Sequence, residues 1–200
     1  MGELNISELN KRREFWDYNP LNYDFEEEQS TGYRERTIKN ASADATIALA
    51  IDFKSRGEIL TKNSVLNQNK KYIPIDANSL EVTEIRVNKI VEKLNSVNAK
   101  SLNIAGNGIY TMKGKYTQQQ IDDFTYKLLK SVLESPNLKT KIESIRTGGQ
   151  TGFDEAGAKA GMRLGIPTKV LAPKGWKFRN ENGIDISDEG KFKERFGHQI

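Results

Sequence analysis

Short apolar runs alternate with segments of helical periodicity from residue 45 to residue 172, and this alternation restricts the fold more than any other feature. Each apolar run has the length of a strand, and each intervening segment has the apolar spacing of a helix with one buried face. Strands are expected at 45–51, 71–76, 101–105, 142–147 and 168–172. Helices are expected at 57–69, 80–96, 117–134 and 152–164. The pattern predicts an α/β fold with a mainly parallel sheet of about five strands.

Single residues refine these expected elements. Pro74 lacks a backbone N–H, so its strand should end there or lie at an edge of the sheet. Thr83 is a plausible N-cap for the helix that follows it. Gly165 stands where glycine typically ends a helix.

The first 35 residues differ from the rest of the chain. They combine six aromatic residues with the acidic run Glu26–Glu28, and we expect an N-terminal arm with one short helix around 7–15. The aromatic side chains would attach this arm to the rest of the molecule. Residues 36–200 are expected to form a single domain, which is large enough to build its own core.

Composition excludes several classes of function. The 200 residues include no cysteine, which rules out a disulfide framework, cysteine zinc sites and thiol chemistry. No metal-ligand cluster is evident, and no apolar stretch is long enough to span a bilayer. The net charge of +4 is spread along the chain, so nucleic-acid binding is not favoured. We expect a cytoplasmic protein without a membrane partner, in a bacterial cytosol or a phage-infected host cell.

The loop between the fourth expected strand and its helix is the strongest candidate site. It consists of Gly148, Gly149, Gln150, Thr151 and Gly152. Glycines allow a ligand to approach the backbone, and the start of the following helix offers unpaired N–H groups to an anion. In parallel sheets ligands bind beyond the carboxyl ends of the strands, where this loop lies. The loop therefore predicts a cradle for a phosphate or another anion.

Carboxylates at the starts of two helices are candidates for chemistry. Asp154 could cap its helix, contact a ribose hydroxyl or act as a base, and these alternatives stay open. Glu58 could simply complement its helix dipole, but it is the best general acid/base candidate if it faces the pocket. Glu155 is a further catalytic candidate.

The loop after the fifth strand could complete the site. Lys174 and Arg179 would supply positive charge for a phosphate, and Trp176 could stack on a base. Phe178 is expected to pack the loop onto the domain instead. His198 is read as a tail residue.

The segment 144–156, followed by 164–167 and 172–176, resembles the opening of the "putative molybdenum carrier" family. That family belongs to the SLOG superfamily, whose relatives include the LOG and DprA proteins. The resemblance implies a Rossmann-like three-layer sandwich and recognition of nucleotides or nucleotide-derived ligands. It gives no ligand residue that demands molybdenum.

The order of the motifs departs from that family. Its glycine motif lies near the N-terminus, whereas here the segments 33–47, 57–61 and 102–106, which resemble its later half, come first. We therefore predict a circular permutation, with Arg36 and Gly149 facing one cavity. Asn107 replaces the usual residue after the terminal strand of the family. The resemblance and the loops together predict ligand-binding roles for Arg36, Asn40, Gly57, Thr61, Gly106, Asn107, Gly148, Gly149, Gln150, Thr151, Gly152, Asp154, Lys174, Gly175 and Trp176.

Two functions remain in competition. The favoured hypothesis is a protein that binds a nucleotide or nucleotide-derived ligand, as a sensor or a sequestering protein in a conflict between phage and bacterium. The alternative is a LOG-like phosphoribohydrolase that cleaves an N-glycosidic bond, with Glu58, Asp154 or Glu155 as the catalytic carboxylate. DprA-like nucleic-acid binding is a weaker third. No cofactor beyond the nucleotide-like ligand is expected, and homo-oligomerisation is compatible with all three.

Overall fold

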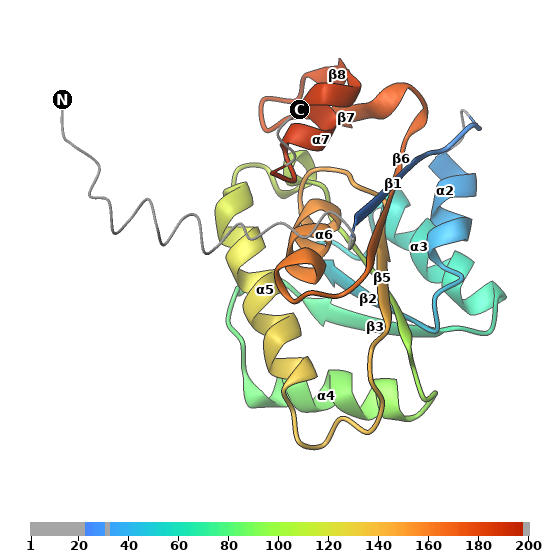
Figure 1. Ribbon diagram of the computed structural model, residues 1–200. Coiled ribbons are helices and arrows are strands. Elements are labelled where there is room, and N and C mark those ends of the chain that lie inside the picture. The colour runs from blue at the N-terminus through green and yellow to red at the C-terminus, as the bar shows by residue number, and fades with distance from the viewer. Residues whose placement is uncertain (1–22, 31–32, 198–200) are drawn as a thin grey trace.

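The computed structural model describes residues 23–30 and 33–197 and shows a parallel sheet between two layers of helices (Figure 1). Within these ranges six strands pair in the order β1-β6-β5-β4-β2-β3, and every pairing is parallel. They are β1 (Tyr23–Glu27), β2 (Ala45–Ala50), β3 (Lys71–Asp76), β4 (Ser101–Gly106), β5 (Ser144–Thr147) and β6 (Thr168–Ala172). The predicted α/β class with a mainly parallel sheet is confirmed.

The helices divide between the two faces of the sheet according to the direction in which the chain moves. They are α2 (Tyr33–Asn40), α3 (Arg56–Asn67), α4 (Glu84–Asn95), α5 (Gln118–Leu133) and α6 (Phe153–Arg163). Figure 1 shows α2 and α3 on one side and α5 and α6 on the other. Right-handed crossovers require this, because β1 to β3 advance toward one edge and β4 to β6 toward the other. The direction reverses between β2 and β4, which is the topological switch point.

The main core lies between the sheet and α4, α5 and α6. The interior strand β2, which pairs with β4 and β3, is buried along its whole length, as its predominantly apolar sequence predicts. Small residues let α6 approach the sheet closely, since a Cβ at Gly157 would lie 2.5 Å from Ile104. Thr83 caps α4 and Gly165 takes a positive φ of 69° after α6, both as predicted. Pro74 lies in β3, an edge strand.

A second, smaller unit covers the carboxyl end of β6. It contains the 3-10 turn η3 (Lys174–Trp176), the hairpin β7 (Lys177–Arg179) and β8 (Asp185–Ser187), and the short helix α7 (Glu189–Glu194). Phe178, Phe192 and Phe196 form its apolar centre against Val170. The prediction that Phe178 packs this region onto the domain is confirmed, because only 5% of it is exposed.

The N-terminal prediction needs a correction. Residues 23–27, expected in an arm outside the domain, form β1, which pairs in parallel with β6. The strand was not predicted because its sequence is acidic rather than apolar. An edge strand needs little apolar surface, and the carboxylate of Glu26 lies 2.6 Å from the ammonium group of Lys169. The expected helix at 7–15 lies outside the described residues.

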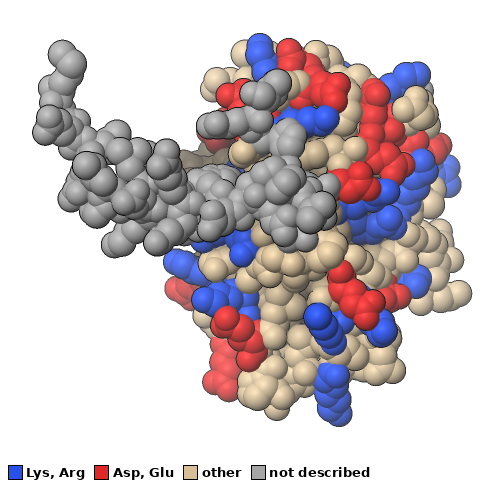
Figure 2. All heavy atoms as spheres, viewed as in Figure 1, with Lys and Arg blue, Asp and Glu red and all other residues tan. Residues whose placement is uncertain are grey.

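No helix in the described part of the chain combines the length and apolar character needed to cross a membrane. On the face seen in Figure 2, lysine and arginine side chains lie among acidic ones rather than in a continuous basic stripe. Long stripes of positive charge are what the phosphate backbone of a nucleic acid usually requires.

Candidate ligand-binding site

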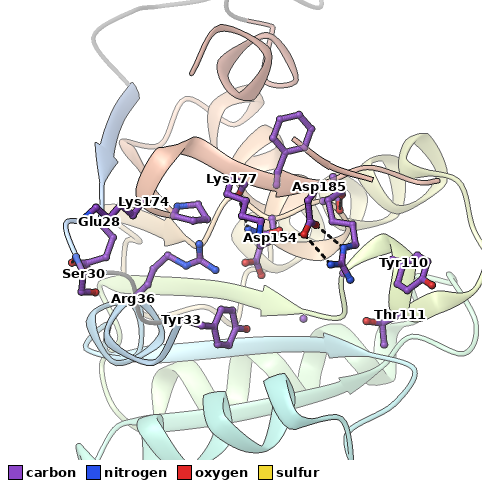
Figure 3. Close-up of a pocket in the computed structure, with 17 residues that line it drawn as sticks. Glu28, Ser30, Tyr33, Arg36, Tyr110, Thr111, Asp154, Lys174, Lys177 and Asp185 are labelled. Atoms are coloured by element: carbon purple, nitrogen blue, oxygen red, sulfur yellow. Dashed lines mark hydrogen bonds and ion pairs between the residues drawn. The ribbon is translucent and has the colours of Figure 1, made fainter. Parts of the chain in front are cut away.

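A pocket of about 430 Å³ opens at the carboxyl edge of the sheet (Figure 3). It is lined by the loops that follow β1, β4, β5 and β6, by the start of α2 and by the hairpin of β7 and β8. The predicted site residues that line it are Arg36, Gly106, Gln150, Thr151, Asp154, Lys174 and Arg179. The guanidinium of Arg179 is already paired with Asp185 at 2.7 Å. Segments from both ends of the chain therefore meet here, as the permutation requires.

A smaller cavity of about 20 Å³ lies behind the pocket and shares some of its lining. The predicted site residues around it are Arg36, Asn40, Thr61, Gly106, Gly148 and Asp154. A cavity of this size has room for about one water molecule. The buried Oδ1 atom of Asn103, which also lines it, accepts no hydrogen bond from any described residue.

Asp154 lies between the two cavities and rests on the glycine loop itself. A Cβ placed on Gly148 would lie 2.5 Å from Oδ2 of Asp154, so the carboxylate is in contact with the loop backbone. The backbone N–H groups of Gly106 and Gln150 donate toward this carboxylate. The loop predicted to cradle a foreign anion thus holds the carboxylate of its own first-turn aspartate.

Burial raises the pKa of Asp154 to about 6 from an ordinary value of 3.8. Arg36 and the two backbone N–H groups oppose this rise without cancelling it. The carboxylate is therefore ionised at neutral pH but titrates near it, which is a property of groups at functional sites.

Arg36 reaches the pocket from the buried side of α2. Only 3% of the residue is exposed, and its guanidinium lies 5.1 Å from the ring centroid of Tyr33. Within residues 24–30 and 33–197, no group accepts a hydrogen bond from this guanidinium or lies within ion-pair distance of it, and the nearby carboxylate of Asp154 acts on it only at longer range. A buried cation without a partner is costly, so this one is placed to meet an anion.

The corner beside Arg36 adds further polar groups. The buried hydroxyl of Ser30 lies near the carboxylate of Glu28, on which it acts weakly, and makes no hydrogen bond of ordinary geometry with a described residue. Lys174 is exposed and lines the same pocket. Glu28 also lies here, but Lys39 neutralises it at 2.7 Å, and this contact holds the pKa of Glu28 below its usual range.

The side chains of Gln150 and Thr151 have structural partners rather than free donors. The Gln150 amide donates to the carbonyl of Lys177 at 3.0 Å, and the Thr151 hydroxyl donates to that of Arg179 at 2.7 Å. Both were predicted to bind a ligand directly. They hold β7 against the glycine loop, and thereby fix the outer wall of the pocket.

Gly149 and Trp176 face away from the pocket, which corrects two predictions. A Cβ on Gly149 would lie 2.6 Å from Val170 and 2.7 Å from Phe192, in the second apolar unit. Trp176 packs edge-on against Phe192, with ring centroids 5.5 Å apart. Arg36 therefore shares its cavities with Gly148, Gln150 and Thr151, the neighbours of Gly149, rather than with Gly149 itself.

Two other glycines have structural roles instead of the predicted contact with ligand. The N–H of Gly152 donates to Gln118 at 2.7 Å, and its φ of 94° with close backbone neighbours excludes a side chain. The N–H of Gly175 donates to Glu27 at 2.6 Å, which ties the loop after β6 to the end of β1. Neither glycine lines the pocket.

Glu155 is not available as a catalytic residue. It is 3% exposed, and its two oxygens are bound by Lys159 at 2.6 Å and Arg195 at 2.5 Å. The side chain leaves α6 on a different face from Asp154, because consecutive helical residues face about 100° apart.

Glu58 is buried but lines neither cavity described above. Burial, followed by the charges of Asp154 and Asp52, raises its pKa to about 8. Its Oε2 atom is buried without a hydrogen-bond partner in the described chain. Gly57 before it lies against Tyr33, since a Cβ there would be 3.4 Å from the hydroxyl.

Asn107 joins two loops rather than facing a ligand. Its Oδ1 accepts the N–H groups of Ile51 and Asp52, both at 2.9 Å, and its amide donates to the Asp52 carbonyl at 3.2 Å. Its side chain is therefore engaged in these protein contacts and lines neither cavity. Asn107 fills the space beyond the end of β2, so the pocket extends over the ends of β4, β5, β6 and β1.

Several lining residues were missed by sequence reasoning. Tyr33, Tyr110 and Lys177 line the pocket, and Tyr110 is 57% exposed. Tyr110 lies in the 3-10 turn η2 (Ile109–Met112), within the loop that follows β4. Tyr110 was missed because an aromatic residue in a loop usually packs against the protein, and the sequence does not show that this one is exposed.

Comparison with known proteins gives matches in two of three cases. The circularly permutated YpsA SLOG family matches residues 14–133. No curated protein matches the chain significantly.

Among the residues that the structure describes, no group of three or more potential metal ligands could hold a metal ion.

Two crystal structures are similar to parts of the chain. The putative molybdenum carrier protein from Syntrophus aciditrophicus is 25% identical, with a TM-score of 0.43 over 53% of this chain and 63% of that chain. The NADH-dependent butanol dehydrogenase A from Thermotoga maritima is 12% identical, with a TM-score of 0.39 over 77% of this chain and 43% of that chain. The chain thus spans less than two thirds of either protein.

The family match settles the predicted permutation. It covers more than half of the 200 residues and begins before the motifs that resemble the later half of an unpermuted relative. The glycine loop follows the matched region in sequence but meets it in space, because Arg36 and Gly148 border one cavity. The chain belongs to the circularly permutated YpsA SLOG family.

Proposed function

We propose that this protein binds a nucleotide or a nucleotide-derived ligand in the pocket at the carboxyl edge of the sheet. The buried guanidinium of Arg36 carries this proposal, because it faces the pocket without an acceptor in the described chain. An anionic group of the ligand would accept hydrogen bonds from the Arg36 guanidinium and pair with its charge. The pocket volume of about 430 Å³ is within the range of small-molecule sites.

The wider role is a sensor or a sequestering protein. Few groups in the pocket are arranged for chemistry, since Glu155 is held by two cations and Glu58 lies outside the lining. Tight binding without turnover suits a protein that reports or withholds a nucleotide signal, for example during conflict between phage and bacterium. Family membership supports a nucleotide-related ligand at the coarser level.

Hydrolysis of an N-glycosidic bond is the second candidate, and one observation favours it. Asp154 lies in the pocket with a pKa of about 6, which suits a group that exchanges protons near neutral pH. A carboxylate in that state could accept a proton from a water molecule as the water oxygen bonds to the sugar carbon and the N-glycosidic bond breaks. The same proton could then pass to the base, which leaves as a neutral molecule.

One experiment separates the two functions. The full chain is incubated with nucleoside mono-, di- and triphosphates, NAD derivatives and cyclic nucleotides, and thermal stability and product chromatography are measured on the same samples. Stabilisation with recovery of intact nucleotide supports binding, whereas release of a free base supports hydrolysis. Absence of both responses across the panel would contradict both candidates.

A further inference from the structure

Building on this nucleotide-binding role, we propose that the sugar hydroxyls of the ligand bind Asp154, while its phosphate lies at Arg36, Ser30 and Lys174. The glycine loop then contacts the sugar rather than the phosphate. This orientation is opposite to the anion cradle that the glycine motif predicts.

The first reason is that the loop already holds an anion. Oδ2 of Asp154 rests on Gly148, and the N–H groups of Gly106 and Gln150 point at the same carboxylate. A phosphate placed there would meet a negative charge in a half-buried site, where screening by solvent is weak. A neutral hydrogen-bond donor meets no such repulsion.

The second reason is that unpartnered donors gather elsewhere in the pocket. Arg36 is 3% exposed, and no described residue accepts from its guanidinium. The Ser30 hydroxyl is buried and acts weakly on the nearby carboxylate of Glu28, but makes no hydrogen bond of ordinary geometry in the described chain. Lys174 adds a charge at the same end, and the carboxylate of Glu28, which lines the pocket there, is neutralised by Lys39. These groups match the oxygens of a phosphate.

The third reason is the order of these groups along the sheet edge. The loops after β6, β5 and β4 are neighbours, and they contribute Lys174, Asp154 and Tyr110 in that order. Figure 3 shows the same sequence, with Lys174 and Arg36 at one end, Asp154 between, and Tyr110 at the other. Strand spacing puts the outer two loops about 10 Å apart. Cation, acceptor and aromatic ring thus follow one another as phosphate, sugar and base do in a nucleotide.

A carboxylate with free lone pairs is a strong acceptor for two hydroxyl groups on adjacent carbons. Hydrogen bonds to a charged acceptor are stronger than those between neutral groups. A ligand without these hydroxyls would leave the remaining lone pairs of the Asp154 carboxylate dehydrated and without donors, which weakens binding further. The structure therefore predicts preference for ribonucleotides over their dideoxy counterparts.

The test measures affinity by calorimetry for the 5′-monophosphates of adenosine, guanosine, cytidine and uridine, each beside its 2′,3′-dideoxy form. At least one ribonucleotide is expected to bind about 10- to 100-fold more tightly than its dideoxy form. Equal affinity within each pair would overturn the inference and leave nucleotide binding intact. Failure of all eight compounds, with no response from the wider nucleotide panel, would overturn both.

Two variants test the two ends of the ligand separately. Asp154→Asn should reduce the ribose preference to less than about 3-fold, since a neutral amide is a weaker acceptor. Lys174→Ala should weaken nucleoside monophosphates by about 2- to 5-fold and leave the matching nucleosides unchanged. Asp123→Asn is the matched control, because Asp123 is partly exposed on α5 and does not line the pocket.

The opposite orientation makes a different prediction for Asp154→Asn. A phosphate on the glycine loop would gain from loss of the negative charge, so the variant would bind ribo- and dideoxynucleotides more tightly by the same factor. Inorganic phosphate would also bind more tightly. Either result, in a variant whose circular dichroism matches the parent protein, would overturn the inference.

Discussion

Two clusters of buried charge flank α6, and they differ in how completely their members are paired. The helix-side cluster consists of Asp122, Glu155, Lys159 and Arg195, which join α5 and α6 to the residue that follows α7. The pocket-side cluster consists of Arg36, Glu58 and Asp154. The two groups share one helix and similar burial, so pairing is what separates them.

In the helix-side cluster each charge has a close partner. Lys159 lies 2.7 Å from Asp122 and 2.6 Å from Glu155. Burial opposes its charge, but these two carboxylates raise the pKa of Lys159 above its ordinary value. Arg195 also donates to the carbonyl of Gly149 at 2.8 Å, and its guanidinium lies 4.1 Å from the ring centroid of Phe178. The cluster therefore holds the glycine loop in place.

The pocket-side cluster has no comparable pairing. The Oε2 atom of Glu58 has no donor, and the guanidinium of Arg36 has no acceptor, in the described chain. Burial raises the pKa values of the Glu58 and Asp154 carboxyls. Incomplete pairing of buried charge is costly, so it persists where a ligand completes it. The comparison teaches that burial alone does not mark a site, because the charges of the helix-side cluster are also buried but are paired within the protein.

The largest expected effect comes from breaking the paired cluster. Glu155→Gln leaves Lys159 and Arg195 buried beside a neutral amide, and should lower the free energy of unfolding by about 3–5 kcal/mol. Urea denaturation at pH 7 measures this. Glu143→Gln is the control, because Glu143 forms an exposed pair with Lys100 at 3.1 Å. A loss no larger than that of the control would remove the distinction between the two clusters.

Gly149 lies between the helix-side cluster and the second apolar unit, and its substitution is expected to cause the next largest loss of stability. Gly149→Ala should cost about 2–4 kcal/mol, because its Cβ would press on Val170 and Phe192 and its φ of 68° is unfavourable. The bulkier Gly149→Val should cost more. Gly114→Ala isolates the backbone contribution, since Gly114 has a φ of 73° but no neighbour within 4 Å. Thermal unfolding of the two alanine variants should therefore separate them, and similar losses would contradict the packing argument.

The smallest expected effect is a change in pH dependence at Glu58. Its pKa rises from 4.5 in the unfolded chain to about 8 on folding, so the folded protein retains a proton that the unfolded chain releases. Stability is then highest at low pH within this window and falls as pH rises from about 4.5 to 8. Glu58→Gln should remove this fall and be more stable than the parent by about 1–3 kcal/mol at pH 8.5.

Denaturation at pH 6 and pH 8.5 tests the Glu58 prediction. The control is Glu84→Gln, since Glu84 occupies the first turn of α4 and is exposed. A variant of Glu58 that is less stable than the parent at pH 8.5 would show that its carboxylate has a partner when ionised. Such a result would move Glu58 into the paired class and weaken the comparison.

Much of the site can be located from sequence, because the topology of a parallel sheet fixes where its loops meet. The motifs along the chain assign Gly148, Asp154, Arg36 and Lys174 to one site, and each of them lines the pocket or the small cavity behind it. Their side-chain partners could not be predicted. Glu155 differs from Asp154 by one position and one methylene group, yet it is held by two cations, one of them from a distant segment.

The alternation of apolar runs and helical segments, together with the order of the motifs, determined the fold class and the circular permutation, because both are patterns along the chain. Only the tertiary structure decided which donors remain free. Gln150 and Thr151 turn to β7, Asn107 turns to the loop after β2, and Asp154 occupies its own glycine loop. The physical reason is that a hydrogen bond depends on which groups lie within about 3 Å. That proximity is set by segments far apart in the chain.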